Sequence, residues 1–474
     1  MDLPIFHLDW LNNRFLIGII AVLHVFINHP LAVGGIAFVS TLEWWGRRTG
    51  DARWDKLAYR IMTTFFVITT TIGAMTGVGI WFSAGLVNPI AIGSLIRVFY
   101  WGWFTEWIVF VTEVVLILIY YLTWKSWTAQ GDAKKRSHIR LGFGLAAASW
   151  LTMVLIVAIL GFMMDTGTWL RDKSFFSAFL NPAYLPQLSF RTPVAMMMAG
   201  GAGLFLVVFF TRGDREFRMK AVRAIALWQL CWSPFAFLGA TWYANIIPST
   251  MIANLSVANT TQHFAEWFSI VKQLVLYVTL GGMVLAAWAV IRPQWYPRAM
   301  YFVPFIGFLF LLGHFERVRE FIRKPFAIGN YLYSNGIRAQ DYPLLQKEGM
   351  LKHLTYISAR EITPENQVRV GKELFMAACS RCHTINGINN ISSNLEAMYG
   401  KSKTWETDVV ANYFVAMHKT RTFMPPFPGN DDERKAIASY LVWLQTNRDE
   451  AEPAQSSGVT IPKTEQQPGM AQQR

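Results

Sequence analysis

Eight long apolar stretches occupy the first two thirds of the chain, and polar connections separate them. A helix of roughly 20 apolar residues spans a hydrocarbon core of about 30 Å, so these stretches are long enough, or nearly long enough, to cross a membrane. The pattern therefore predicts an all-α, polytopic transmembrane helix bundle of about eight spans, of which the fifth and eighth are short. The stretches cover residues 15–39, 61–82, 98–124, 141–164, 194–211, 221–243, 264–291 and 300–315.

Behind the last apolar stretch the chain becomes polar. Residues 329–366 form a mixed connector, and residues 448–474 are rich in Gln, Pro, Ser and Glu, a composition that predicts a disordered tail. Between them lies a segment that ends in an amphipathic helix at 431–444. We therefore expect a membrane domain at 1–328, the connector at 329–366, a small all-α domain at 367–447 and the tail at 448–474.

The small domain contains the sequence Cys379-Ser380-Arg381-Cys382-His383. Two thiols at C-x-x-C-H spacing add to the vinyl groups of a haem, and the adjacent histidine supplies an axial nitrogen to the iron. Chance occurrence is the alternative, and the specificity of the spacing weighs against it. The motif predicts one covalent haem c held by Cys379, Cys382 and His383.

A second axial ligand is expected downstream on a rigid loop, and Met424 lies in the proline-rich run 422–427. The order of attachment motif, Met-Pro loop and closing amphipathic helix resembles that of a class I monohaem cytochrome c. Because haem c is normally matured on the outer face of a membrane, the resemblance implies a periplasmic domain.

Composition agrees with a membrane protein, since 53% of the 474 residues are hydrophobic and the mean hydropathy is +0.28. The net charge of +13 does not indicate nucleic acid, because its placement follows the membrane pattern. Seventeen Lys and Arg residues lie around the connections after stretches one, three, five and seven, whereas the N-terminal tail and the other connections carry five. The positive-inside rule makes the first set cytoplasmic, so the N-terminus and the C-terminal domain are expected outside, at a bacterial inner membrane.

The start of the chain and the cysteines add little further chemistry. No basic region or small-residue cleavage site precedes the first stretch, so residues 1–13 are expected to remain as an outer tail rather than a signal peptide. Cys231 lies within the sixth stretch, and no disulfide framework is expected.

Ionisable side chains inside the apolar stretches are costly and are therefore the candidates for chemistry. They could form one cluster in the outer half of the membrane, suited to haem ligation and proton delivery. For His29, His263 and His314, a hydrogen bond to a neighbouring helix is an equal alternative, and Glu266 and Glu316 are expected to be solvated at the interface. The candidates are His24, His29, Glu106, Glu113, His263, Glu266, His314, Glu316 and Glu320.

Several of these residues stand in short motifs that resemble subunit I of cytochrome bd-type oxidases. His24 follows Arg14-Phe15 and precedes Pro30-Leu31, and the segment 320–329 follows the eighth stretch. Met75-Thr76-Gly77 and the span-three glutamates agree in order as well. The resemblance implies that His24 and Glu320 are ligands of a high-spin haem pair, with Arg323 nearby. It implies that Glu106 and Glu113 act in proton transfer or lie next to a haem. It also implies one or two membrane haems, b and/or d.

The chain departs from that family where the low-spin haem would be ligated. The corresponding positions read 190–193 (FRTP) and 272–274 (KQL), without the expected His and Met. The outer connection that binds quinol in the family is shortened to 244–262, and a cytochrome c domain replaces the ninth span. The losses all concern quinol oxidation, so we expect that the cytochrome c domain has replaced quinol as the source of electrons for the membrane haems.

These observations favour a bd-like terminal oxidase subunit that takes electrons from a periplasmic cytochrome c or other redox protein and reduces dioxygen to water. A second membrane subunit, and further subunits of a respiratory complex, are the partners that the resemblance implies. The alternative is a relay without oxygen chemistry, which moves electrons between a quinone and haem c through bis-histidine haems on His29, His263 and His314. A transporter or sensor is disfavoured because nothing marks a substrate path.

Overall fold

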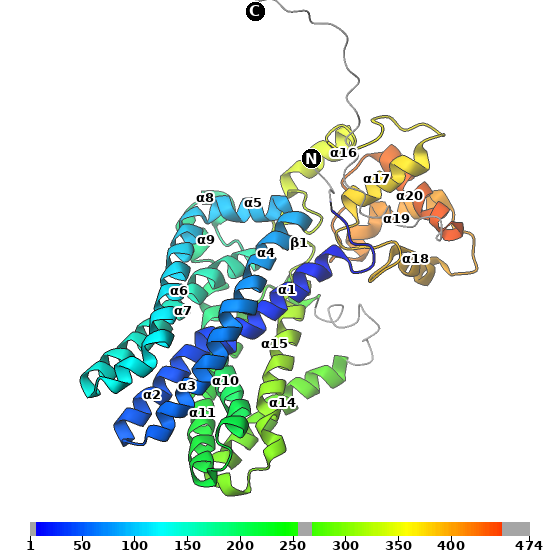
Figure 1. Cartoon of the computed structure of the whole chain (residues 1–474). Helices are drawn as coiled ribbons and strands as arrows, with labels where there is room; N and C mark the ends of the chain where they lie inside the picture. Colours follow the sequence, from blue (N-terminus) through cyan, green and yellow to red (C-terminus); the bar gives the residue numbers. More distant parts are fainter. Residues whose placement is uncertain (1–5, 255–267, 448–474) are drawn as a thin grey trace, which may run out of the picture.

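The computed structural model describes residues 6–254 and 268–447, and it consists of a long helical bundle with a smaller helical domain at one end (Figure 1). Within these residues, seven helical segments are long and apolar enough to cross a membrane. They are Asn13–Thr49, Ala52–Val87, Tyr100–Ala129, Asp132–Met164, Tyr184–Phe210, Arg215–Ile246 and Arg298–Ile322. The all-α membrane bundle predicted from the apolar pattern is thereby confirmed.

The seventh expected helix is α14 (Phe268–Ile291), which begins directly after the segment that is not described. Two of the seven segments are each composed of two α-helices joined by a π-helical turn. The first joins α1 (Asn13–Ile27), the π-helical turn η1 (Asn28–Val33) and α2 (Gly34–Thr49), and the second joins α3 (Ala52–Ile68), η2 (Thr69–Gly73) and α4 (Ala74–Val87). The other five contain α6 (Tyr100–Ala129), α7 (Asp132–Met164), α10 (Tyr184–Phe210), α11 (Arg215–Ile246) and α15 (Val303–Ile322).

Local sequence signals explain where these helices begin and end. Gly50, with φ +69°, follows α2, and Asp51 accepts a hydrogen bond from the backbone N–H of Arg53 to start α3. Asp214 caps α11 in the same way through the N–H of Phe217. Each of these turns therefore carries its own stop and start residues, and both lie at the end of the bundle away from the small domain (Figure 1).

Small residues let the membrane helices cross closely. A Cβ on Gly34 would lie 2.1 Å from the carbonyl oxygen of Ala195, and one on Gly239 would lie 2.3 Å from that of Ser189. Glycine is therefore required where α2 and α11 each cross α10, as is common where membrane helices pack through their backbones. Around α10 the main core gathers side chains of α2, α3, α7 and α11.

Between the bundle and the small domain lie β1 (Phe326–Ile328), β2 (Leu332–Tyr333) and α16 (Tyr342–Glu348). The two strands pair antiparallel, and β1 packs with the bundle. Residues 337–354 instead join the hydrophobic cluster of the small domain. The segment expected to be a polar connector is therefore largely folded against the two parts that it links.

The small domain contains α17 (Gln367–Ala378), α18 (Ile391–Tyr399), α19 (Thr407–Thr420) and α20 (Asp431–Thr446). A capping box formed by Asn430 and Glu433 starts α20. A Cβ on Gly371 would lie 2.1 Å from the carbonyl oxygen of Ala436, so α17 and α20 cross with their backbones almost in contact. Shorter elements complete the described chain: α5 (Pro89–Val98), α8 (Trp169–Asp172), α9 (Phe175–Phe179), α12 (Ser249–Ile252), η4 (Pro293–Trp295), η5 (Arg298–Tyr301) and η6 (Ala339–Asp341).

Candidate haem-binding sites

The C-x-x-C-H sequence begins where α17 ends, with Cys379 as its C-cap. The Nδ1 atom of His383 lies 3.3 Å from the carbonyl oxygen of Asn389. The amide nitrogen of Asn394 lies slightly farther from the same atom, at 3.4 Å. A proton on Nδ1, donated to the Asn389 carbonyl, leaves the lone pair of Nε2 for a metal. Burial, helped by the charge of Lys324, lowers the pKa of His383 to about 4, so the imidazole is neutral at physiological pH. These residues fit a covalently attached haem.

Met424 lies in the turn between α19 and α20. Its backbone N–H donates to the carbonyl of Arg421 at 2.8 Å, and its own carbonyl accepts from Nδ1 of His418 at 2.6 Å. Pro425 and Pro426 follow directly and restrict the backbone further. The turn is thus well ordered by local contacts, and the role of Met424 as second axial ligand stays a prediction.

His24 lies on α1 and faces α4. Its Nδ1 lies 3.2 Å from the carbonyl oxygen of Gly73, so Nδ1 carries the proton, and Nε2 accepts a hydrogen bond from the Asn28 amide at 3.2 Å. A Cβ on Gly77 would lie 3.2 Å from the imidazole, so glycine makes room for the ring. An imidazole with a fixed Nδ1–H and an accepting Nε2 is the form that ligates iron, with the Asn28 amide as the group that a metal would displace.

Two π-helical turns meet beside His24. One is η1, which follows α1, and the other is η2, which contains Gly73, the residue that accepts from the imidazole. Such turns are rare, and they occur frequently at functional sites because they re-aim side chains within a continuous helix. The sequence reading did not identify either of them, although Pro30 within η1 is a signal for the first.

His29 is buried in a charged network that the sequence reading did not foresee. Arg191 on α10, only 1% exposed, donates from Nη1 to Nε2 of His29 at 3.2 Å and from Nη2 to Glu316 at 2.5 Å. Arg319 donates to the second oxygen of Glu316 at 2.9 Å. A buried carboxylate between two guanidinium groups is strongly held, and its loss would leave charges without partners.

The expectation that Glu316 is solvated near the interface is therefore wrong. It followed from ending the eighth apolar stretch at residue 315, whereas α15 continues to Ile322 and turns Glu316, 6% exposed, towards α10. Arg191 was likewise counted among the cations of an outer connection, but α10 begins at Tyr184 and carries Arg191 inside the bundle. In both cases the helix extends beyond its apolar stretch because ion pairing compensates the buried charges.

Glu320 lies one turn further along α15, at the end next to the small domain. Arg323 reaches both carboxylate oxygens from Nη2 at 2.7 Å, and Nε of Arg14 lies 3.8 Å away. Arg323 is buried and also donates to the carbonyl of Ala327 at 2.5 Å. Two guanidinium groups therefore fix an ionised carboxylate whose side chain is still 33% exposed, which suits a group that must face a ligand.

Glu106 and Glu113 lie seven residues apart on α6, which packs against α7. Glu113 accepts hydrogen bonds from Ser149 and, at 3.3 Å, from Thr152, both on α7. Glu106 is half-buried on the same helix. In the described part of the chain, the pair makes no hydrogen bond or ion pair with His24, Arg191 or Glu320. The ionisable residues that the sequence suggested as one cluster therefore lie in separate groups.

The structure says little about two further candidate histidines, His314 and His263. His314 on α15 is half-buried, and its ring stacks on that of Phe310 with centroids 6.5 Å apart. His263, together with Glu266, lies outside the described residues. Neither observation tests their expected role in haem binding.

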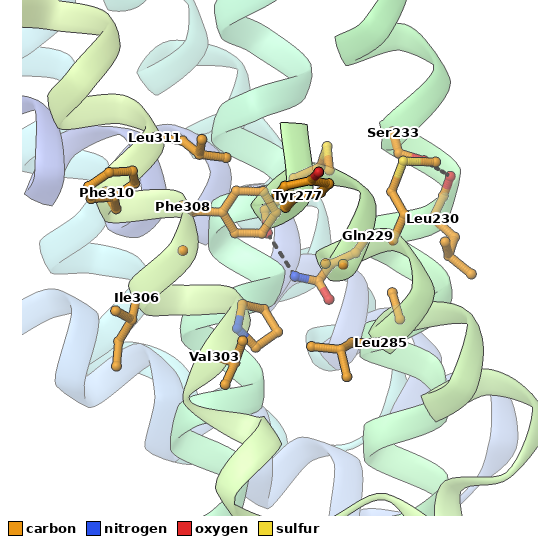
Figure 2. Close-up of a pocket in the computed structure, with 17 residues that line it drawn as sticks. Gln229, Leu230, Ser233, Tyr277, Leu285, Val303, Ile306, Phe308, Phe310 and Leu311 are labelled. Carbon is orange, nitrogen blue, oxygen red and sulfur yellow. Dashed lines mark hydrogen bonds between the residues drawn. The ribbon is translucent and has the colours of Figure 1, made fainter. Parts of the chain in front are cut away.

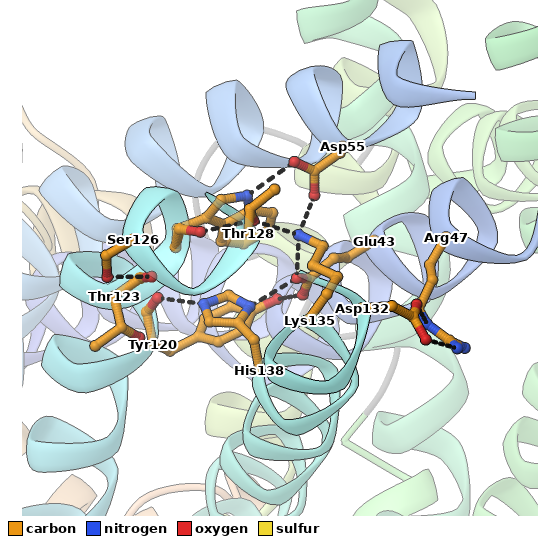
Figure 3. A network of polar contacts seen from close by, with 11 residues as sticks. Glu43, Arg47, Asp55, Tyr120, Thr123, Ser126, Thr128, Asp132, Lys135 and His138 are labelled. Carbon is orange, nitrogen blue, oxygen red and sulfur yellow. Dashed lines mark hydrogen bonds and ion pairs between the residues drawn. The ribbon is translucent and has the colours of Figure 1, made fainter. Parts of the chain in front are cut away.

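A second polar network lies at the end of the bundle away from the small domain, and the sequence reading gave its histidine no role (Figure 3). His138 on α7 is fully buried, with Nδ1 2.6 Å from Glu43 of α2 and Nε2 2.8 Å from the carbonyl of Tyr120. Tyr120 donates to the other oxygen of Glu43 at 2.8 Å, and Lys135 joins Glu43 to Asp55 of α3. Four membrane segments are tied together there.

An apolar cavity of about 490 Å³ lies between α10, α11, α14 and α15 (Figure 2). Few polar groups reach it, among them Gln229 and Ser233. Their donors are used within the fold, since the Gln229 amide donates to the carbonyl of Met197 at 3.3 Å and the Ser233 hydroxyl to that of Leu230 at 2.9 Å. Among the described residues that line the cavity, none is expected to ligate haem.

Comparison with known proteins agrees with this architecture. The family model described as "Cytochrome C oxidase, cbb3-type, subunit III" matches residues 366–441. Among solved structures, the bd oxidase from Geobacillus thermodenitrificans matches with a TM-score of 0.56 and 16% identity, over 67% of this chain and 89% of that chain. A search of curated protein sequences gives no match. The chain therefore joins a membrane bundle with the fold of a bd oxidase to a C-terminal cytochrome c domain, and it is an electron-transfer haem protein of the membrane.

Proposed function

We propose that this chain is the haem-bearing subunit of a bd-like terminal oxidase. It accepts electrons from a periplasmic redox protein at haem c and passes them to membrane haems held by His24 and Glu320. There, each dioxygen takes four electrons and four protons to give two waters. The observation that carries the proposal is the position of the cytochrome c domain at the end of a bd oxidase fold where α1 begins and α15 ends (Figure 1).

The chain's own residues supply the parts that this reaction needs. A haem bound between these residues would supply the iron at which dioxygen is reduced. His24 presents an accepting Nε2, and Glu320 presents a carboxylate that Arg323 and Arg14 keep ionised. Glu113, bonded to two hydroxyl groups of α7, and Glu106 on the same helix face can hold protons within the bundle.

Two further features support the assignment to a multi-subunit complex in the bacterial inner membrane. The basic connections lie at the end of the bundle opposite the cytochrome c domain, which supports a periplasmic position for haem c (Figure 1). Glu106 is half-exposed on α6 beside the exposed residues Trp107 and Ile108. Since a carboxylate facing lipid is costly, this face supports a second membrane subunit that covers α6.

The relay without oxygen chemistry has less support. It needs imidazoles free to ligate iron in pairs, but Nε2 of His29 already accepts from Arg191, which itself is paired with Glu316. Recruiting His29 would leave that guanidinium without one of its partners in a low-dielectric interior.

Optical spectroscopy of the purified complex tests the proposal. We expect a high-spin membrane haem that binds carbon monoxide, together with oxygen uptake from a reduced soluble cytochrome. The Glu320→Gln variant should lose carbon monoxide binding and at least nine tenths of the oxygen uptake, while haem c remains attached. Asp408→Asn, which changes an exposed carboxylate on α19, is the matched control. Spectra with only low-spin membrane haems would overturn the proposal and favour the relay.

A further inference from the structure

The residues that lead into α1, together with its first residue Asn13, form a closed loop, which we call the N-terminal strap (residues 6–13). Asn13 holds both of its ends, since its amide donates to the carbonyl of Phe6 at 2.8 Å and its oxygen accepts from the N–H of Leu8 at 2.8 Å. The N–H of Asn12 donates to the carbonyl of Leu8 at 2.9 Å, and Asn12 takes a positive φ of 79°. The strap is thus built by its own sequence and passes directly into the helix of His24.

The strap is hydrogen-bonded to the loop that carries His383, the expected haem c ligand. The Asp9 carboxylate accepts from the N–H of Ile385 at 2.5 Å and from that of Asn386 at 3.0 Å, and the Asn12 amide donates to the carbonyl of Cys382 at 2.6 Å. Asp9 and Asn12 are 6% and 4% exposed. Three hydrogen bonds, two of them to a carboxylate, therefore hold both sides of His383 to the start of α1.

Close packing supports these bonds from the cytochrome side. A Cβ on Gly387 would lie 2.0 Å from the carbonyl oxygen of Asp9, so only glycine lets the loop approach the strap. The loop of Met424 is also in contact with the bundle, because Phe423 packs on Phe321 of α15 with ring centroids 5.8 Å apart. Of the two loops expected to bracket haem c, one thus contacts the strap that leads into the His24 helix, and the other contacts the helix that carries Glu320.

A cytochrome domain that swung on a tether between partners would not need such contacts. Burying an aspartate and pairing it with backbone N–H groups stabilises one position of the attachment loop. The consequence for electron transfer is direct, because tunnelling rates fall exponentially with the distance between donor and acceptor. A strap that holds the attachment loop against α1 also holds the distance from haem c to a haem near His24.

We propose that Asp9 and Asn12 are positioning residues for electron transfer: they lock the haem c attachment loop onto the start of α1, so that electrons leave haem c through this fixed contact. An external donor must therefore reach haem c from a face that the strap does not cover. The inference rests on the proposed function insofar as the membrane haems are the acceptors. It does not require those haems to reduce dioxygen.

The test follows one electron in the intact complex without dioxygen. A short light pulse on a ruthenium photoreductant reduces haem c, and the absorbance of haem c and of the membrane haems then reports the transfer. We expect the Asp9→Ala/Asn12→Ala double variant to slow transfer at least tenfold, with unchanged haem content and unchanged photoreduction of haem c. Asp9→Asn, which keeps one acceptor oxygen, should fall between the double variant and the native protein.

Gly387→Ala provides an independent arm because it leaves Asp9 and Asn12 intact and displaces the strap from the cytochrome side. It should slow the same step, whereas Asp408→Asn, an exposed change within the cytochrome domain, should not. Native transfer rates in both the double variant and Gly387→Ala would overturn the proposal. Slowed transfer in a complex whose membrane haems bind no carbon monoxide would instead refute the oxidase assignment and leave the strap in place.

Discussion

At the scale of single residues, the buried pair of Arg191 and Glu316 changes how the membrane helices must be read. Both residues lie beyond apolar stretches in sequence, and both are inside helices in the structure. Their charges are compensated by each other and by Arg319, and His29 accepts from the same guanidinium. A charged residue near the end of an apolar run therefore need not mark the end of the helix.

Glu316→Gln should destabilise the bundle strongly. Removing one partner of a buried ion pair costs about 3–5 kcal/mol, because Arg191 and Arg319 would be left with uncompensated charge. The measurement is the thermal unfolding temperature of the detergent-solubilised complex, with the haem c band as an internal standard. Glu216→Gln, which alters an exposed i,i+4 pair with Lys220, is the control and should change little. Equal unfolding temperatures for the two variants would contradict the role of Glu316.

Met424→Ala tests the second axial ligand of haem c. Loss of the thioether should abolish the weak charge-transfer band of Met-ligated haem at the red edge of the visible spectrum, and it should lower the reduction potential. Haem should stay attached through Cys379 and Cys382. Met417→Ala, on the preceding helix, is the control, and a band that survives in the Met424 variant would mean that another residue is the ligand.

At the scale of elements, the strap connects the membrane bundle to the haem c attachment loop through the carboxylate of Asp9. The strength of this contact therefore depends on pH. Burial raises the pKa of Asp9, but hydrogen bonds from His7 and from the N–H groups of Ile385 and Asn386 outweigh it and leave the pKa below its ordinary value of 3.8. A lowered folded-state pKa means that the stabilisation is complete above the ordinary value and is lost as the pH falls through the lowered one.

Hydrogen exchange of the Ile385 and Asn386 amides should report this dependence. After correction for intrinsic exchange rates, their protection should stay constant above about pH 4 and fall below it, since a protonated Asp9 is a poorer acceptor. In Asp9→Asn the protection should be lower and should not change with pH over this range. Protection that changes equally in both proteins would show that Asp9 is not its source.

The network around Glu43 connects four membrane segments and should act mainly on stability (Figure 3). Glu43→Ala leaves Lys135, His138 and Tyr120 without their shared acceptor, so we expect a loss of about 3–5 kcal/mol. Thermal unfolding measures this loss, and the spectra of the haems should be unchanged in the folded variant. Asp132→Ala, which removes an exposed partner of Arg47, should cost much less. Altered membrane-haem spectra in Glu43→Ala would place the network closer to the redox chemistry than this prediction allows.

At the scale of the whole molecule, the chain combines a cytochrome c domain and a membrane bundle in one polypeptide. One of the two segments expected to lack a low-spin haem ligand, 190–193, contains Arg191, which already pairs with Glu316. The outer connection associated with quinol is short, and part of it lies outside the described residues. We therefore expect electrons to enter the protein only through haem c.

We accordingly predict that quinol does not reduce this protein directly. Reduced quinol mixed anaerobically with the purified complex should leave the membrane haems oxidised for at least as long as ascorbate with a small mediator takes to reduce haem c. The mediator experiment is the positive control. Prompt reduction of the membrane haems by quinol, with haem c following, would contradict the replacement of the quinol input.

The sequence alone determined those features that depend on local chemistry. Apolar stretches of membrane-spanning length, the C-x-x-C-H spacing and the placement of basic residues each follow from neighbouring residues, because burial in lipid, thioether formation and charge translocation act on short segments. The membrane bundle and the cytochrome c domain were therefore predicted correctly from the sequence.

Only the tertiary structure decided which polar residues meet. Arg191 and Glu316 are 125 residues apart, Glu43 and His138 are 95 apart, and Asn12 and Cys382 are 370 apart. Neither spacing nor composition encodes such pairs, since each forms only when helices from distant segments pack at one crossing. The strap shows the same limit, because a short polar tail acquires its role from the loop that the fold brings to it.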